Sequence, residues 1–178
     1  MKKTLLLTLF IVTLSGCDKP SVERVNQPVS VSLLQQAMQQ YKWHAQQLMI
    51  AVRIRSEQQL IAELAVELLA HSSPLLISLN DALPQCKQYF LALQNKLGSL
   101  VSRQQYATSN DSITLQGLPD FTEPSCYYVA ELVINPAQVA LLARTALPLE
   151  QGYQDVELTM RETLAYLKQL ENIVKPSY

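Results

Sequence analysis

The fold is decided by residues 29–52, which read VSVSLLQQAMQQYKWHAQQLMIAV. Their apolar side chains recur at alternating steps of three and four positions, which is the spacing of one face of an α-helix. Either Ser30 or Ser32 is a suitable N-cap for it. The stretch therefore predicts a long amphipathic helix with one apolar stripe facing a core. The stripe comprises Val31, Leu34, Met38, Tyr41, Ala45, Leu48 and Val52.

The helical pattern continues beyond this stretch, because no glycine or proline interrupts residues 29–73. A single helix over residues 30–70 would be about 60 Å long, which is excessive for a domain of this size. Ser56-Glu57-Gln58-Gln59 fits the capping-box pattern, and the apolar phase changes after it. We therefore expect a break near Arg55 or Ser56, followed by a second helix.

Prolines divide the remainder of the chain, because proline suits the first turn of a helix and interrupts its interior. Ser72-Ser73-Pro74 is expected to end the second helix and to start a short one over residues 75–82. Pro84 begins a helix that reaches about Val101. Asn135-Pro136 reads as the cap and first turn of a helix through about Thr145, and Pro148 precedes the last helix. That last helix carries Tyr153, Val156, Met160, Leu164, Leu167, Leu170 and Val174 on one face.

These patterns predict an all-α protein, an irregular bundle of about five or six helices in a single domain over residues 30–175. Residues 102–125 form a long irregular region, of a length that is often functional. Cys126–Ile134 suits either a strand or a helix. Because Ile113-Thr114-Leu115 alternates like a strand, one short strand pair is expected near residues 113–134.

Two cysteines, Cys86 and Cys126, lie within the predicted domain. In an oxidising compartment such a pair most simply forms one disulfide, although two free thiols or a metal pair remain alternatives. The bridge would fasten the far end of the irregular region beside Pro84.

The N-terminal stretch MKKTLLLTLFIVTLSGC has the pattern of a cleaved export signal: Lys2 and Lys3, an apolar run, then two small residues. The apolar run is too short to span a bilayer, which takes about 20 residues. The ending Leu14-Ser15-Gly16-Cys17 resembles the lipobox of bacterial lipoproteins. That resemblance implies that residues 1–16 are removed and that Cys17 is acylated.

The resemblance to lipoproteins also concerns sorting. In enterobacterial lipoproteins, Asp directly after the lipidated cysteine often retains the protein at the inner membrane, and Asp18 holds that position. Lys19 follows, and the outer membrane is the alternative. Residues 17–29 are polar without a period and read as a tether between lipid and domain. We expect a protein that faces the periplasm.

Composition excludes several classes of partner. Removing residues 1–16 leaves 178 − 16 = 162 residues, with 14 − 2 = 12 basic and 15 acidic side chains. The resulting formal charge is −3, and no basic run remains. Nucleic acid is therefore not an expected partner.

No catalytic pattern is present in the sequence. The three glycines that remain cannot build a phosphate loop or a dinucleotide fingerprint, and HExxH and calcium-loop patterns are absent. His44 lies beside the stripe and reads as a core-edge or surface histidine. Glu63 and Glu67, one turn apart, could bind a cation but read as a solvated face. We expect no enzyme, no cofactor and no metal site.

The mature protein reads instead as a protein-binding accessory or inhibitor. Candidate types are a secretion pilot, a lipoprotein that excludes incoming plasmids, and an immunity protein against a periplasmic toxin. The alternative is a small-ligand or lipid carrier with a pocket between helices. The candidate partner-binding residues are Leu118 and Phe121 in the irregular region and Tyr127 and Tyr128 after it. Tyrosines combine apolar area with a polar tip, although ordinary packing explains them equally well.

Overall fold

The computed structural model describes residues 29–106, 118–119, 123–145 and 150–175. Five α-helices and one short 3-10 helix account for nearly all of this part of the chain. The elements are α1 (Val29–Arg53), α2 (Gln58–Ala82), η1 (Pro84–Cys86), α3 (Lys87–Tyr106), α4 (Pro124–Thr145) and α5 (Glu150–Ile173). The predicted all-α class is confirmed.

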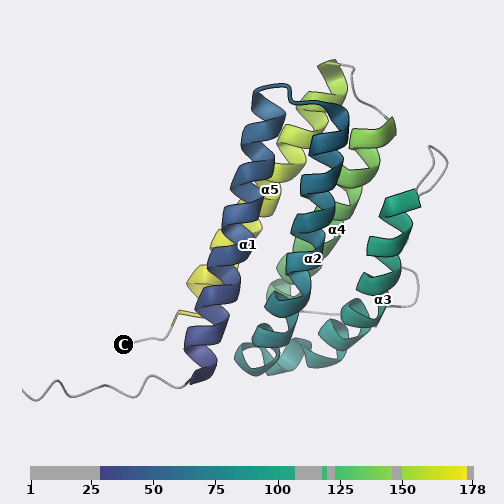
Figure 1. Ribbon diagram of the computed structural model, residues 1–178. Coiled ribbons are helices and arrows are strands. Elements are labelled where there is room, and N and C mark those ends of the chain that lie inside the picture. Colours follow the sequence, from purple (N-terminus) through teal and green to yellow (C-terminus); the bar gives the residue numbers. More distant parts are fainter. Residues whose placement is uncertain (1–28, 107–117, 120–122, 146–149, 176–178) are drawn as a thin grey trace, which may run out of the picture.

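Four helices form a closed ring in which each packs against two ring neighbours: α1 on α2, α2 on α4, α4 on α5 and α5 on α1. Consecutive helices around the ring run in opposite directions, so that α1 begins and α5 ends at the same end of the bundle (Figure 1). The predicted stripe of α1 faces the interior, where Tyr41, Ala45, Leu48 and Val52 are completely buried.

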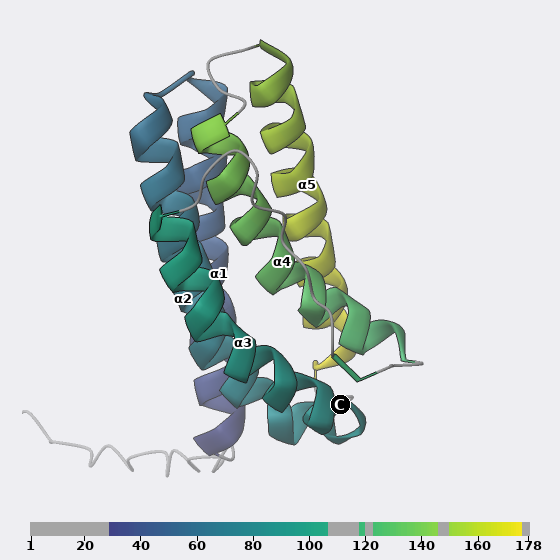
Figure 2. The same ribbon diagram turned by 90° about the vertical axis from the view of Figure 1, so that its right-hand side faces the viewer.

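The fifth helix, α3, lies outside the ring against α2 and α4 (Figure 2). It buries Tyr89, Phe90 and Leu93 there. Because α2 and α4 each contact three helices, apolar residues cover most of their surfaces. By length and composition alone, both could cross a membrane. Burial inside the bundle accounts for that composition.

The disulfide joins Cys86, the last residue of η1, to Cys126 in the first turn of α4, with the two Cα atoms 5.4 Å apart, and so holds the start of α3 beside the start of α4. The predicted pairing is present in the structure. From these joined starts, α3 and α4 run in the same direction (Figure 2).

The break between the first two helices falls where the sequence predicts it. Arg55 adopts a left-handed backbone conformation with φ of 56°. The amide of Ser56 donates to the carbonyl of Ala51, and that of Arg55 to the carbonyl of Val52, which together form a Schellman motif. From α5, Glu150 pairs with the Arg55 guanidinium, which lies 4.8 Å from the ring centroid of Tyr153.

The predicted capping box is not seen. Glu57 is the N-cap residue of α2, and its side chain makes no capping hydrogen bond. The Schellman motif at the end of α1 and the contacts of Arg55 with α5 stabilise the turn. The start of α2 therefore does not depend on a side-chain cap.

Two proline predictions are wrong, because Pro74 lies inside α2 and Pro136 lies inside α4. An interior proline deprives the carbonyl four residues earlier of its helical donor. For Pro74 that carbonyl belongs to Ala70, which is exposed and can be hydrated. The sequence rule fails here because the freed carbonyl belongs to an exposed residue, where solvent can replace the missing amide.

At Pro136 the orphaned carbonyl belongs to buried Leu132, and two hydroxyls replace the missing donor. The Tyr41 hydroxyl of α1 donates to the Leu132 oxygen at 2.6 Å, and the Ser72 hydroxyl of α2 donates to it at 3.0 Å. Burial raises the pKa of Tyr41 well above its usual value, so the phenol keeps its proton. Three helices thus meet at one carbonyl oxygen.

The strand pair expected near residues 113–134 is not seen. Residues 126–134 belong to α4, where Cys126, Val129, Ala130 and Val133 are buried. Residues 113–117 lie outside the described part of the chain. The β-branched and aromatic character of this stretch reflects burial against three neighbouring helices.

Removing one of the hydroxyls that donate to the Leu132 carbonyl is expected to lower the free energy of unfolding more when Pro136 is present than when Pro136 is replaced. Tyr41→Phe should lower the free energy of unfolding by about 1–3 kcal/mol, because a buried carbonyl loses a donor. In a Pro136→Ala background the amide of residue 136 restores a helical donor, and the loss should shrink. Urea unfolding of the four proteins measures this coupling, expected at about 0.5–3 kcal/mol. An equal loss in both backgrounds would contradict the shared-carbonyl account.

Breaking the disulfide is expected to lower the free energy of unfolding by about 2–5 kcal/mol, because the bridge restricts the unfolded chain. The sequence separation of its two cysteines is 40. Thermal melting with and without reductant measures the effect, and Cys86→Ala/Cys126→Ala serves as the control. A wild-type melting temperature that is the same with and without reductant would disprove the prediction.

Candidate functional site

A groove runs along the outer surface between α1 and α2, with a volume of about 290 Å³. Its floor is apolar, and it extends to the turn that joins the two helices. The groove is lined by Trp43, His44, Gln47, Ile50, Ala51, Ile54, Ser56, Leu60, Leu64 and Glu67.

Large apolar side chains stand exposed along this groove. Trp43 is 56% exposed, Ile50 51%, Ile54 70% and Leu60 45%. These are four of the ten large hydrophobic residues that are exposed in the described part of the chain. Contiguous exposed apolar surface of this kind marks binding sites more often than scattered single residues do.

Three potential ligand residues cluster beside the groove, His44 from α1 and Glu67 and His71 from α2. The His44 Nδ1 and Glu67 Oε1 atoms are 3.5 Å apart. The two imidazole rings stack, with centroids 3.8 Å apart and planes 24° from parallel. Trp43 packs edge-on against His44 with centroids 4.6 Å apart.

Burial lowers the pKa of His71, and the neighbouring His44 lowers it further, whereas Glu67 acts in the opposite direction. The neutral form of His71 is therefore favoured. A neutral imidazole carries a lone pair that can accept a proton or bind a metal ion. The donor atoms of the three residues all lie within 4.8 Å of one another.

Sequence reasoning did not bring these residues together. His44 and His71 are 27 positions apart, and only the antiparallel packing of α1 on α2 makes them neighbours. A usable signal exists in the spacing of Trp43, Ile50 and Ile54, which follow one another at steps of seven and four. That spacing is a second apolar stripe on α1, outside the one that faces the core.

The predicted partner-binding tyrosines lie at the first turns of α4 and contact α5. Tyr128 stacks on Tyr166 with centroids 5.6 Å apart, and it packs against the core. Tyr127 meets Tyr166 edge-on at 5.6 Å and is 39% exposed. The hydrogen bond to Tyr166 and burial raise the pKa of Tyr127, and the neighbouring Glu131 adds to the effect.

Of the other two predicted partner-binding residues, Leu118 lies in the described part of the chain. Leu118 is partly buried and packs against the hydrophobic core. Phe121, like Cys17 and Asp18, lies outside the described residues. The assignment of Leu118, Phe121, Tyr127 and Tyr128 to partner binding stays a prediction.

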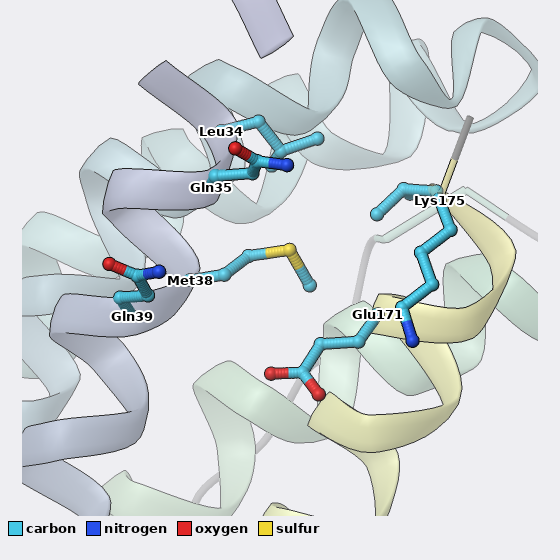
Figure 3. A pocket seen from close by; sticks show the side chains of 7 residues that line it. Leu34, Gln35, Met38, Gln39, Glu171 and Lys175 are labelled. Atoms are coloured by element: carbon cyan, nitrogen blue, oxygen red, sulfur yellow. The ribbon is translucent and has the colours of Figure 1, made fainter. Parts of the chain in front are cut away.

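A second hollow, of about 270 Å³, lies between the start of α1 and the end of α5 (Figure 3). Leu34, Met38 and Val174 contribute apolar surface, and Gln35, Gln39, Glu171 and Lys175 contribute polar groups. Glu171 also pairs with Lys42, with Nζ and Oε1 3.1 Å apart. The volume falls just below the range of about 300–1,000 Å³ that is usual for ligand pockets.

No family model matches the sequence, and neither a curated protein nor a solved structure matches the chain.

Proposed function

We propose that this chain is a lipid-anchored accessory protein that faces the periplasm and binds a partner protein through the groove between α1 and α2. The observation that carries the proposal is the row of exposed apolar side chains along that groove. Trp43 and the two isoleucines offer the kind of anchor that dominates binding energy at protein interfaces.

The occupant best suited to this groove is an amphipathic helix of the partner. A shallow apolar trough between two packed helices accepts the apolar face of a third, whose anchors recur at three, four and seven positions. The ten lining residues include no lysine or arginine, whereas Glu67 supplies a carboxylate. Charge complementarity therefore favours a partner helix with a basic residue beside its apolar anchors.

The position of the groove suits an anchored protein. The tether precedes Val29, at the start of α1, whereas Ile54 and Leu60 flank the turn at the other end of that helix. A helix of this length spans about 37 Å. The exposed apolar residues near the turn thus lie far from the attachment point and remain accessible to a partner.

The surface near Tyr127 is a weaker candidate for the same role. Leu118 and Tyr128 both pack against the core, which leaves Tyr127 as the exposed member among the described residues. A docking groove is compatible with a secretion pilot, a plasmid-excluding lipoprotein and a toxin-immunity protein alike. The gene's immediate neighbours distinguish these types.

Replacing the lipobox cysteine is expected to detach the protein from the membrane. Cys17→Ser removes the acylation site, so the chain should accumulate as unprocessed precursor or as soluble periplasmic protein. Several acyl chains hold a protein firmly because each buried methylene contributes about 0.8 kcal/mol. Membrane fractionation measures the result. Recovery of the wild-type chain from periplasmic extracts without detergent would refute the anchor.

A charge placed in the groove is expected to abolish partner binding. A photo-crosslinking residue at position 50 of the full chain, in its native cells, should yield one discrete adduct. Ile54→Glu should remove that adduct, because a carboxylate would be desolvated against the partner. Leu158→Glu is the matched control, since Leu158 is 57% exposed on α5 and does not line the groove.

The same pair of variants should melt at the wild-type temperature. Binding of the purified partner to Trp43→Ala should weaken by about 30-fold or more, as expected of an interface hot spot. The crosslinked peptide should map to an amphipathic helix that carries a basic residue. An adduct with a second copy of this chain, or one that survives Ile54→Glu, would overturn the groove assignment.

A further inference from the structure

We propose that His44, Glu67 and His71 together bind one divalent transition-metal ion of the zinc class, with an open coordination position on the wall of the α1–α2 groove. Two imidazole nitrogens and one carboxylate oxygen are the ligand set of many zinc and iron sites. The proposal concerns the ion alone and holds whether or not a partner occupies the groove.

The backbone already brings the three ligands together. Glu67 and His71 are four residues apart in α2, which places them one turn apart on the same helix face. His44 reaches them from α1, and the two helices pack along their length. Ligands on two packed helices are held more rigidly than ligands on loops, which favours binding because less freedom is lost.

The distances fit a metal after small side-chain adjustments. Zinc lies about 2.0–2.2 Å from nitrogen and oxygen ligands, so neighbouring ligands in a tetrahedron are about 3.4 Å apart. The His44 Nδ1 and Glu67 Oε1 atoms already show that separation, at 3.5 Å. All donor atoms of the three residues lie within 4.8 Å of one another, so the ligands would need to move by little more than an ångström to reach tetrahedral spacing.

The surroundings of the cluster also suit a metal. The His44 side chain is only 12% exposed, and its ring is held between Trp43 and His71. Two imidazoles in contact repel each other when both are protonated, whereas a shared cation draws their lone pairs together. Glu67 adds a negative charge to the cluster, which attracts a cation.

The open position follows from the ligand count. Three protein ligands leave at least one tetrahedral position for water or another ligand. His44 and Glu67 both line the groove, so an ion held by them would adjoin it. An ion there could accept a carboxylate or imidazole from whatever molecule enters the groove.

The test uses the full chain in detergent, without a histidine tag, after chelation and dialysis. Calorimetric titration with Zn²⁺ should show one ion per chain, whereas Ca²⁺ and Mg²⁺, which prefer oxygen ligands, should not bind there. Trp43 is the only tryptophan in the sequence and touches His44, so Cu²⁺ should quench its fluorescence at the same stoichiometry.

Variants decide whether the three residues act together. His71→Gln and Glu67→Gln should each weaken Zn²⁺ binding by about 10-fold or more, as losses of metal-site groups do. Glu63→Gln is the matched control, an exposed carboxylate one turn away on the same helix, and should leave the affinity unchanged. Zn²⁺ should raise the melting temperature of the wild type and of Glu63→Gln.

The outcomes are distinct from those of the groove experiment, which alters Ile54 and not the ligands. Unchanged Zn²⁺ affinity in His71→Gln would overturn the site, as would the absence of saturable binding to the wild type. Weakening by His71→Gln but not by Glu67→Gln would overturn the three-ligand assignment. His71 is not among the buried core residues, so its replacement leaves the core of the bundle intact.

Discussion

Pro136 leaves the buried carbonyl of Leu132 without a helical donor, and the hydroxyls of Tyr41 and Ser72 complete it. An unsatisfied carbonyl in this position would cost about 1–3 kcal/mol. The cost favours the one register of α1, α2 and α4 that brings both hydroxyls to the Leu132 oxygen. The apolar stripes alone allow neighbouring helices to slide or rotate by a turn. The two hydrogen bonds fix the positions of α1 and α2 relative to α4, and α5 completes the ring by packing against α1 and α4.

The all-α class, the core faces of α1 and α5 and the break at Arg55 could be predicted from the sequence, because each rests on local periodicity or on uninterrupted helical stretches. The interior prolines could not. Whether Pro74 or Pro136 ends a helix depends on what satisfies the freed carbonyl, and that group lies elsewhere in the fold or in solvent. The ambiguity of residues 126–134 has the same origin, since β-branched residues are tolerated in a helix that is buried on most sides.

The candidate site was less accessible to sequence reasoning. His44 and His71 come into contact only because α1 and α2 pack side by side, and no spacing in the sequence predicts that contact. Trp43, Ile50 and Ile54 did carry a signal, as a second apolar stripe on a helix that already had one. One apolar stripe is enough to pack α1 against the core. The second stripe is exposed, and it marks the position of the groove.

The buried hydroxyl of Tyr41 also sets the behaviour of the bundle in alkali. Its folded-state pKa lies well above that of an unfolded tyrosine, so the proton is bound more tightly in the folded chain. The stability that this proton confers is complete below about pH 10, the ordinary tyrosine pKa, and is lost progressively as the pH rises above it. A Tyr41 phenolate would be a charge buried away from water, and it would repel the Leu132 carbonyl oxygen to which the hydroxyl had donated a hydrogen bond. Raising the pH above about 10 therefore lowers the stability of the bundle, because the unfolded chain releases the Tyr41 proton more readily than the folded chain does.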